Sequence, residues 1–405
     1  MKRVLKTILA TLCLSLTISL LSEGEMSPLP TASASAAVKK TKKSGTSKKS
    51  TGKGKKNTKT GKKTTGKGKK TVKSTKPATP TVSTIMSDPS TGEWMHRGAK
   101  GIIVHRDKEG KLRAMSPFSA SYTAGRSYAA ALNRYADELS REAVQIYSLI
   151  APTQGEFYMP PIGSAMGSEE RAINTTYNNM SRRIKTVSVC DTMRNHLDEE
   201  IYSRTDHHWA PLGAYYAAKA FAEAAGVPFL PLEAYSTDSV MDYVGTMVKF
   251  SGDNSIRSYP ETFYYYKPAE GYSTEFITYT VSNGKTVGES EPHPEAFFRK
   301  FPDGSMAAYS TFMGGDTRTV KVWNTGGTPD RKLLIVKDSY GNAMAPCLFG
   351  SFEEVHVVDF RYYPHNLLDY VIDNDITDLL FVNCIELAFA GSTANRLNIM
   401  IDAEY

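Results

Sequence analysis

LLIVKDSYGNAMAP, residues 333–346, combines a short apolar run with a candidate nucleophile. Four consecutive aliphatic residues at 333–336, bounded by charged residues, predict a short buried strand of a parallel sheet. Ser339 follows this strand, and α/β folds hold ligands outside the carboxyl ends of their strands. If a helix begins after Ser339, its unpaired N–H groups point at the group that the serine attacks. This segment therefore predicts half of a site for nucleophilic catalysis.

A base for Ser339 is offered by TDHHW, residues 205–209. A serine hydroxyl is a weak nucleophile until a base takes its proton, and the base works best when a third group fixes its tautomer. In extended backbone, Asp206 and His208 would lie on one face, so the carboxylate could hold one ring nitrogen while the other reaches the serine. His207 would then face away. The alternative is that Asp206 satisfies backbone donors near the following helix and both histidines are partly buried polar residues.

The rest of the chain alternates between strand and helix patterns, which predicts an α/β fold. Residues 227–330 interrupt this alternation with β-type runs and with Asn283-Gly284, a dipeptide typical of tight hairpins. We therefore expect one three-layer domain with a β-rich insertion at 227–330. Strands are expected at 101–104, 143–150, 184–189, 263–266, 276–281, 319–323, 333–336, 355–358 and 379–382, and helices at 120–140, 192–200, 212–225, after Ser339 and near 366–374.

Residues 1–36 predict a secretory signal peptide. Three basic residues precede an apolar run at 8–21, and ASASA at 32–36 offers cleavage sites between small residues. The apolar run is shorter than the ~18–20 residues that a spanning helix needs, so an uncleaved membrane anchor is the less favoured alternative. The protein is expected to be secreted or associated with the cell envelope.

Residues 37–92 predict a disordered, Lys-rich linker ahead of a folded domain at 93–405. Residues 39–76 contain 17 Lys and no acidic residue, and they lack the side chains that form a core. Because residues 1–38 carry three bases and two acids, the overall charge of +7 leaves −11 on residues 77–405. The Lys-rich tail could bind an anionic cell-surface polymer or act only as a solvated spacer. Nucleic acid is not expected as a partner of an exported chain.

Cys190, Cys347 and Cys384 remain once the signal peptide is removed. An odd number of cysteines does not predict a disulfide framework in an exported protein. Cys347 and Cys384 lie in apolar surroundings and are expected to be buried. The sequence also lacks four ligands at the spacing of a structural zinc site, so neither a metal nor a cofactor is expected.

Residues 205–214 and 337–346 resemble the two signature blocks of the DHHW-motif family of exported bacterial proteins. Residues 357–363 and 376–381 resemble two further blocks. That family is similar to the SGNH hydrolase-like acyltransferases, to which the alginate O-acetyltransferases belong. The resemblance implies a three-layer, flavodoxin-like parallel sheet. In ordinary SGNH esterases an Asp-x-x-His block follows the serine, whereas here a block one residue shorter precedes it, which implies a permuted motif order.

The resemblance implies roles for three residues: Ser339 is the nucleophile, His208 the base and Asp206 the group that orients the base. Asp338 could brace the turn before the nucleophile or lie on the surface. Lys337 stands where the usual Gly-Asp-Ser has its glycine, which leaves the backbone less free.

The groups that would hold the oxyanion have no sure match in this sequence. Candidates are the backbone N–H of Ser339 and the side chains of Asn342 and Asn383. Arg361 could hold an anionic sugar or form an ordinary salt bridge within the acidic domain. Trp209 could stack on a sugar ring or pack in the core.

The resemblance implies an exported O-acyltransferase, most simply an O-acetyltransferase of a cell-surface or secreted polysaccharide. A membrane-bound O-acyltransferase is the implied partner on the acetyl-donor side. A carbohydrate esterase or deacetylase would use the same site with water as the acceptor. A different class is a non-catalytic module that binds a wall polymer, with the Lys-rich tail as its adhesive.

Overall fold

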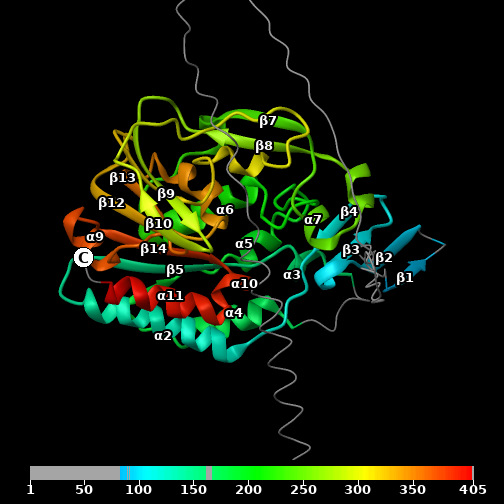
Figure 1. Ribbon diagram of the computed structural model, residues 1–405, viewed down its shortest axis with the longest axis horizontal. Helices are drawn as coiled ribbons and strands as arrows, with labels where there is room; N and C mark the ends of the chain where they lie inside the picture. Colours follow the sequence, from blue (N-terminus) through cyan, green and yellow to red (C-terminus); the bar gives the residue numbers. More distant parts are fainter. Residues whose placement is uncertain (1–82, 89, 91, 161–166, 404–405) are drawn as a thin grey trace, which may run out of the picture. The chain divides into compact units, whose positions relative to one another are not determined.

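The structure is a computed structural model that describes residues 83–88, 90, 92–160 and 167–403. It contains an eight-stranded sheet in the order β10 (Lys285–Glu289), β9 (Ser273–Ser282), β11 (Arg318–Trp323), β13 (Phe352–Asp359), β12 (Thr328–Lys337), β14 (Asp378–Cys384), β5 (Gln145–Ala151) and β6 (Ile184–Thr186) (Figure 1). The five strands from β13 to β6 are parallel. The other three continue the sheet in antiparallel pairing. The predicted α/β class is confirmed.

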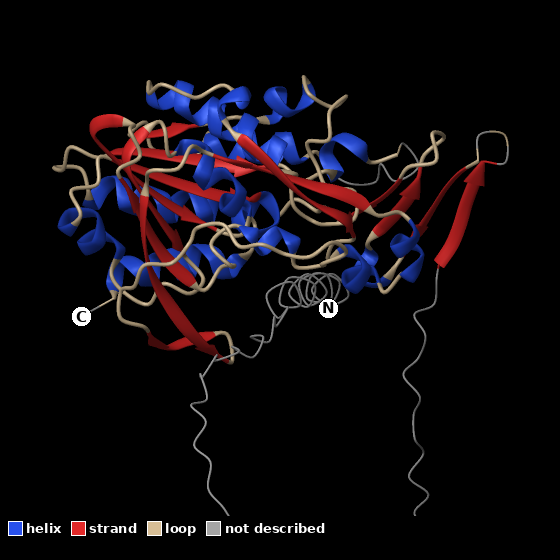
Figure 2. Cartoon of the chain, turned by 90° about the horizontal axis from the view of Figure 1, so that it is seen from above, coloured by secondary structure: helices blue, strands red, loops and turns tan. Residues whose placement is uncertain are grey.

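Helices cover both faces of this sheet because its central strands are apolar on both sides. In β12, Leu333 and Ile335 belong to one core cluster, and Leu334 and Val336 belong to another. The first cluster packs under α6 (Pro211–Ala225) and α8 (Tyr340–Met344). The second cluster, on the other face, packs under four helices: α2 (Tyr122–Glu138), α4 (Glu169–Tyr177), α9 (Leu367–Asp373) and α11 (Gly391–Asp402) (Figures 1 and 2). Burying each large aliphatic side chain contributes roughly 1.5–3 kcal/mol to folding.

Local sequence explains where several of these elements end. Helix α6 starts at Pro211, whose fixed φ suits the first turn, and ends at Gly226 in the left-handed conformation, with φ of 68°. Between β9 and β10, Asn283 and Gly284 have φ of 49° and 70°, as a tight two-residue hairpin requires. These predicted features are confirmed.

Two smaller sheets accompany the main one. The first is an antiparallel sheet in the order β1 (Ser83–Asp88), β2 (Glu93–Arg97), β3 (Ile103–Arg106) and β4 (Leu112–Met115); the second pairs β7 (Ser236–Tyr243) with β8 (Glu261–Lys267). Short helices connect these parts: α3 (Gly155–Tyr158), α5 (Cys190–Arg194), α7 (Met247–Ser251), α10 (Ile385–Ala388), and the 3-10 turns Ala99–Gly101, Leu232–Ala234, Asn254–Ser258, Ala308–Thr311 and Ala345–Leu348.

The structure corrects two predicted boundaries. Strand β1 lies inside 37–92, the stretch predicted as linker, and pairs antiparallel with β2. The helix expected at 192–200 is instead α5, which ends at Arg194. In the β-rich stretch 227–330, strands β9 to β11 belong to the central sheet.

Some predictions fall outside the described residues, namely the signal peptide at 1–36 and the Lys-rich tail. Within the described part, no helix has both the length and the apolar character needed to cross a membrane. Cys190, Cys347 and Cys384 are free and buried, as expected for the last two. Burial raises the pKa of Cys347 to about 12, so this thiol is not a reactive group.

A buried carboxyl group holds the chain just after β5. Glu169, the first residue of α4, is only 1% exposed. Its two oxygens accept hydrogen bonds of 2.6 Å from the backbone N–H and the hydroxyl of Thr153. Burial raises the pKa of Glu169 to about 8, because the ionised form loses its hydration.

This raised pKa predicts a specific pH dependence of stability. Between the ordinary glutamate value of ~4.3 and about 8, the folded protein keeps a proton that the unfolded chain has lost. The contribution of Glu169 to the free energy of unfolding is therefore fully present below the unfolded-state pKa. It is lost as the pH rises through the folded-state pKa. Glu169→Gln should flatten this decline, measured by urea unfolding at several pH values. Parallel curves for the two proteins would contradict the prediction.

Candidate active site

The structure brings the three side chains predicted to act together into one hydrogen-bonded chain. Ser339 Oγ lies 2.7 Å from His208 Nε2. On the other side of the ring, His208 Nδ1 lies 2.5 Å from Asp206 Oδ1. A proton on Nδ1 satisfies the carboxylate and leaves Nε2 free to accept the Ser339 hydroxyl proton. This is the arrangement that a serine nucleophile and its base require.

Sheet topology explains the position of Ser339. It follows β12 by two residues and directly precedes α8. Asp338 fixes the turn between them, because its carboxylate accepts hydrogen bonds from the backbone N–H of Tyr340 at 2.9 Å and of Cys384 at 2.8 Å. Asp338 is fully buried, so of its two predicted roles the structure assigns it the brace.

Asp206 is buried and held from both sides. Its second oxygen accepts hydrogen bonds from the backbone N–H of Thr246 at 2.7 Å and from the Thr246 hydroxyl at 2.8 Å. Burial acts to raise the pKa of Asp206, but the charges of His207 and His208 and these hydrogen bonds hold it well below its usual range. The carboxylate therefore stays ionised and can stabilise a positive charge on His208.

The backbone around Asp206 and His208 differs from the expectation. Residues 204–208 form a bend, not an extended strand. The backbone N–H of His208 donates to Asp206 Oδ1 at 3.2 Å, so the pairing is made within this turn. His207 does not face away: its ring centroid lies 3.7 Å from that of His208.

Aromatic residues fix the imidazole and link the two segments. The Tyr309 ring stacks on His208 at 3.7 Å and 4°, and its hydroxyl donates to the carbonyl oxygen of Ser339 at 3.0 Å. The Tyr340 hydroxyl donates to the carbonyl oxygen of His207 at 2.6 Å. Trp209 is 0% exposed and donates from Nε1 to the carbonyl oxygen of Tyr340 at 3.0 Å. The structure therefore makes Trp209 a core residue, not a sugar-stacking platform.

One carboxylate anchors the chain immediately before Asp206. Glu261 accepts four hydrogen bonds: from the Ser203 hydroxyl at 2.6 Å, from the backbone N–H of Arg204 at 2.9 Å, and from the backbone N–H and hydroxyl of Thr205 at 2.9 and 2.5 Å. Gln154 adds a fifth constraint by donating to the carbonyl oxygen of Asp206 at 2.9 Å. Sequence reasoning did not identify either residue.

Within the described part of the chain, one group of side chains has the spacing of metal ligands. It consists of Asp206, His207 and His208, whose potential ligand atoms lie within 4.8 Å of one another. Each of the three side chains already has a hydrogen-bond partner, however. His207 Nδ1 lies 2.8 Å from the Thr246 hydroxyl, and the other two residues bind each other and Ser339. Burial, with the neighbouring His208, lowers the pKa of His207 to about 4. A metal here would have to displace the hydrogen bonds to Ser339 or Asp206.

A buried ionic cluster lies at the same edge of the sheet. Lys337 is 1% exposed, and its ammonium lies 2.8 Å from Asp359 and 3.3 Å from Asp316. Arg361 pairs with the same two carboxylates at 2.7 and 2.9 Å. Of its two predicted roles, Arg361 therefore forms the ordinary salt bridge. Burial opposes ionisation of Asp316, but Arg361 and Lys337 hold its pKa far below the usual range.

The predicted oxyanion donors lie in different surroundings. Asn342 donates to Asp316 at 2.8 Å, which ties it to the ionic cluster. Asn383 is buried on the α2 side of the sheet, where the Tyr128 hydroxyl donates to its side-chain oxygen at 2.7 Å. The backbone N–H of Ser339 remains the candidate next to the reacting oxygen.

The residues that sequence reasoning missed come mainly from 227–330. Thr246, Glu261, Tyr309 and Asp316 all contact the segments that carry the predicted triad, yet none lies in a motif. The sequence Gly314-Gly315 before Asp316 predicts no more than a turn. Both glycines have positive φ, of 73° and 118°, which is the one local signal that this loop is constrained.

Comparison with known proteins gave family and fold matches. The family model described as "DHHW protein" matches residues 111–358. A crystal structure of a DHHW family protein from Eubacterium siraeum has 34% sequence identity and a TM-score of 0.64, and the match covers 78% of this chain and 97% of that one. Bacillus cereus PatB1 with a sulfonyl adduct has 18% identity and a TM-score of 0.56, covering 75% of this chain and 98% of that one.

A further match, the O-acetyltransferase domain of Pseudomonas putida AlgJ, has 14% identity and a TM-score of 0.40, covering 75% of this chain and 98% of that one. The PatB1 match shows a shared fold, whereas the TM-score of the AlgJ match is too low to show one. No curated protein matches the chain by sequence.

Gly245 offers a steric test of the predicted triad. A Cβ added there would lie 2.5 Å from Asp206 Oδ2 and closer still to its Cβ, so Gly245→Ala must displace Asp206. Because a misplacement of about 1 Å can cost ~10²-fold in rate, ester turnover should fall by about that factor. Gly288→Ala is the matched control, since a Cβ there meets nothing within 4 Å. Equal turnover by the two variants would contradict the role of Asp206.

Proposed function

The chain belongs to the DHHW family, and from this membership we propose that it is an exported O-acyltransferase. It transfers an acetyl group to a hydroxyl of a cell-surface or secreted polysaccharide. The observation that carries the proposal is the unbroken chain of hydrogen bonds from Asp206 through His208 to Ser339, at 2.5 and 2.7 Å. It lies at the carboxyl edge of a parallel sheet, where α/β folds place their ligands.

In the first half-reaction, Ser339 Oγ attacks the carbonyl carbon of an acetyl donor while His208 Nε2 takes the hydroxyl proton. Asp206 stabilises the resulting imidazolium and holds its Nδ1–H. The backbone N–H of Ser339 would donate to the developing oxyanion, an interaction worth roughly 2.7–4 kcal/mol per donor. The tetrahedral intermediate collapses, the bond to the donor breaks, and the departing group receives the proton from His208. The acetyl group is then esterified to Ser339.

In the second half-reaction, a sugar hydroxyl gives its proton to His208 Nε2 as its oxygen attacks the acetyl carbon. The ester bond to Ser339 breaks, and the serine oxygen takes the proton back from His208. The products are an acetylated sugar and the original enzyme. Water in place of the sugar would release acetate, which is the reaction of the alternative esterase.

The proposal also includes the motif order of the fold, export of the protein and its binding partners. We infer an SGNH-like fold in permuted order, supported by the position of Asp206 and His208 before Ser339, with 227–330 as an insertion. The signal-like residues 1–36 support export. A membrane-bound O-acyltransferase would supply the acetyl group, and the Lys-rich tail would hold the protein to an anionic surface polymer.

A serine-directed sulfonyl fluoride tests the nucleophile, and PatB1 has been solved with a sulfonyl adduct. Wild type should be labelled on Ser339, as read by peptide mass spectrometry, whereas Ser339→Ala should not be labelled. Turnover of a small acetyl ester should fall by at least ~10³-fold in the variant, with unchanged circular dichroism. Retained turnover or labelling at another residue would contradict the catalytic proposal and favour the non-catalytic binding module.

The group that accepts the acetyl group, a sugar hydroxyl or water, distinguishes a transferase from an esterase. Incubating the wild type with an acetyl ester and an excess of oligosaccharide should give an acetylated oligosaccharide, detected by mass spectrometry, in addition to free acetate. Free acetate alone, at a rate unaffected by the oligosaccharide, would identify an esterase with the same triad.

A further inference from the structure

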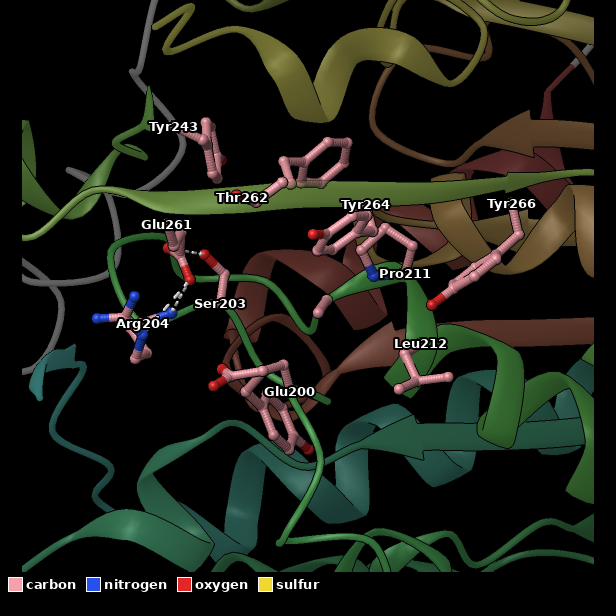
Figure 3. Close-up of a pocket in the computed structure, with 13 residues that line it drawn as sticks. Glu200, Ser203, Arg204, Pro211, Leu212, Tyr243, Glu261, Thr262, Tyr264 and Tyr266 are labelled. Atoms are coloured by element: carbon pink, nitrogen blue, oxygen red, sulfur yellow. Dashed lines mark hydrogen bonds and ion pairs between the residues drawn. The ribbon is translucent and has the colours of Figure 1, made fainter. Parts of the chain in front are cut away.

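A separate pocket of about 420 Å³ lies next to the segment that carries Asp206 (Figure 3). It is formed by residues 200 and 202–204, the start of α6 and strand β8, and neither Ser339 nor His208 lines it. Its volume falls within the ~300–1,000 Å³ typical of small-molecule sites. The pocket is therefore large enough for a ligand of its own, outside the reacting centre.

Strand β8 gives this pocket an aromatic wall, to which Phe263, Tyr264 and Tyr266 contribute. Phe263 and Tyr265 are buried, whereas Tyr264 is exposed and Tyr266 is half-buried. Tyr264 is 54% exposed, so much of its side chain is open to solvent. Figure 3 shows both tyrosines above the opposite wall, where Pro211 and Leu212 begin α6. Exposed aromatic rings in a partly apolar pocket offer flat faces on which a ring with C–H bonds can stack.

The charged residues that line the pocket are Glu200, Glu261 and Arg204. Glu200 is exposed and its nearest cation is the exposed Lys111, at 3.5 Å. Glu261 also lines the pocket. The guanidinium of Arg204 lies 4.0 Å from the Glu261 carboxylate and donates to the carbonyl oxygens of Leu112 and Pro260. The pocket can therefore accept hydrogen bonds from a ligand but offers no free cation to an anionic one.

We propose that this pocket is a binding subsite for a saccharide chain that carries no acidic groups. Tyr264 and Tyr266 would stack on sugar rings, and Glu200 would accept hydrogen bonds from sugar hydroxyls. The inference rests on the proposed function and narrows it: the acceptor is a polysaccharide without uronate or phosphate, held at a distance from Ser339 while another of its units reacts.

The location of the pocket suits this role. Its residues Tyr243 and Phe263 pack near Tyr309, the residue that stacks on His208. Ala210 and Pro211 directly follow Trp209 in the chain. A layer of protein thus separates the pocket from the triad, so a bound sugar is near the site but out of reach of Ser339. Only a chain of several units could occupy both places.

Binding can be measured without any acyl donor, so the result does not depend on turnover. We expect wild type to bind a neutral β-glucan oligosaccharide in isothermal titration calorimetry, and to bind an oligouronate of the same length at least about tenfold more weakly, a difference of ~1.4 kcal/mol. Tyr264→Ala, and the double variant with Tyr266→Ala, should weaken binding of the neutral chain at least tenfold. Tyr122→Ala is the matched control, because Tyr122 is 40% exposed and lies on α2 outside the pocket.

Three results would overturn the inference: no binding of the neutral oligosaccharide, tighter binding of the oligouronate, or equal binding by wild type and Tyr264→Ala. Since Tyr264 is exposed, its variant should fold normally, which circular dichroism checks. Failure of the proposed function has a different signature, namely a Ser339→Ala variant that retains ester turnover.

Discussion

The hydrogen bond between Ser339 Oγ and His208 Nε2 joins residues 131 positions apart in the chain, and the surrounding structure keeps both ends in place. On the serine side, Asp338 ties the turn after β12 to the end of β14. On the histidine side, Asp206 and the stacked Tyr309 ring leave the imidazole little freedom. Because proton transfer requires a heavy-atom separation of ~2.6–3.2 Å, this rigidity is a condition of the proposed chemistry.

The parallel pairing of β12 with β13 also places charged side chains beside this site. Lys337 and Asp359 are register partners on β12 and β13, so their side chains lie next to each other at the sheet edge. A buried ammonium without a partner would be strongly destabilising, and here Asp359 and Asp316 supply two carboxylates against Lys337 and Arg361. The cluster is balanced in charge, so it can order the edge of the sheet without placing a large net charge beside the imidazole.

The sequence predicts the central strands well because each is a short apolar run buried on both faces, and burial of this kind leaves a local pattern. It also brings Asp206, His208 and Ser339 forward as candidates through their motifs. It does not predict Thr246, Glu261 or the bend at 204–208. Those side chains act through contacts that span about 40 to 60 positions, and such contacts leave no periodicity or motif in the segments that make them.

The pairing of charged side chains differs between the two regions. Beside Ser339, Lys337 and Arg361 are paired with Asp316 and Asp359. The pocket beside β8 presents the exposed Tyr264, the half-buried Tyr266 and the exposed Glu200, whose carboxylate lies 3.5 Å from Lys111. Glu261 belongs to both regions, since it lines the pocket and holds Thr205 next to Asp206. A ligand that excludes water from this carboxylate would strengthen its hydrogen bonds to the triad segment, so that polymer binding and catalytic order would support each other.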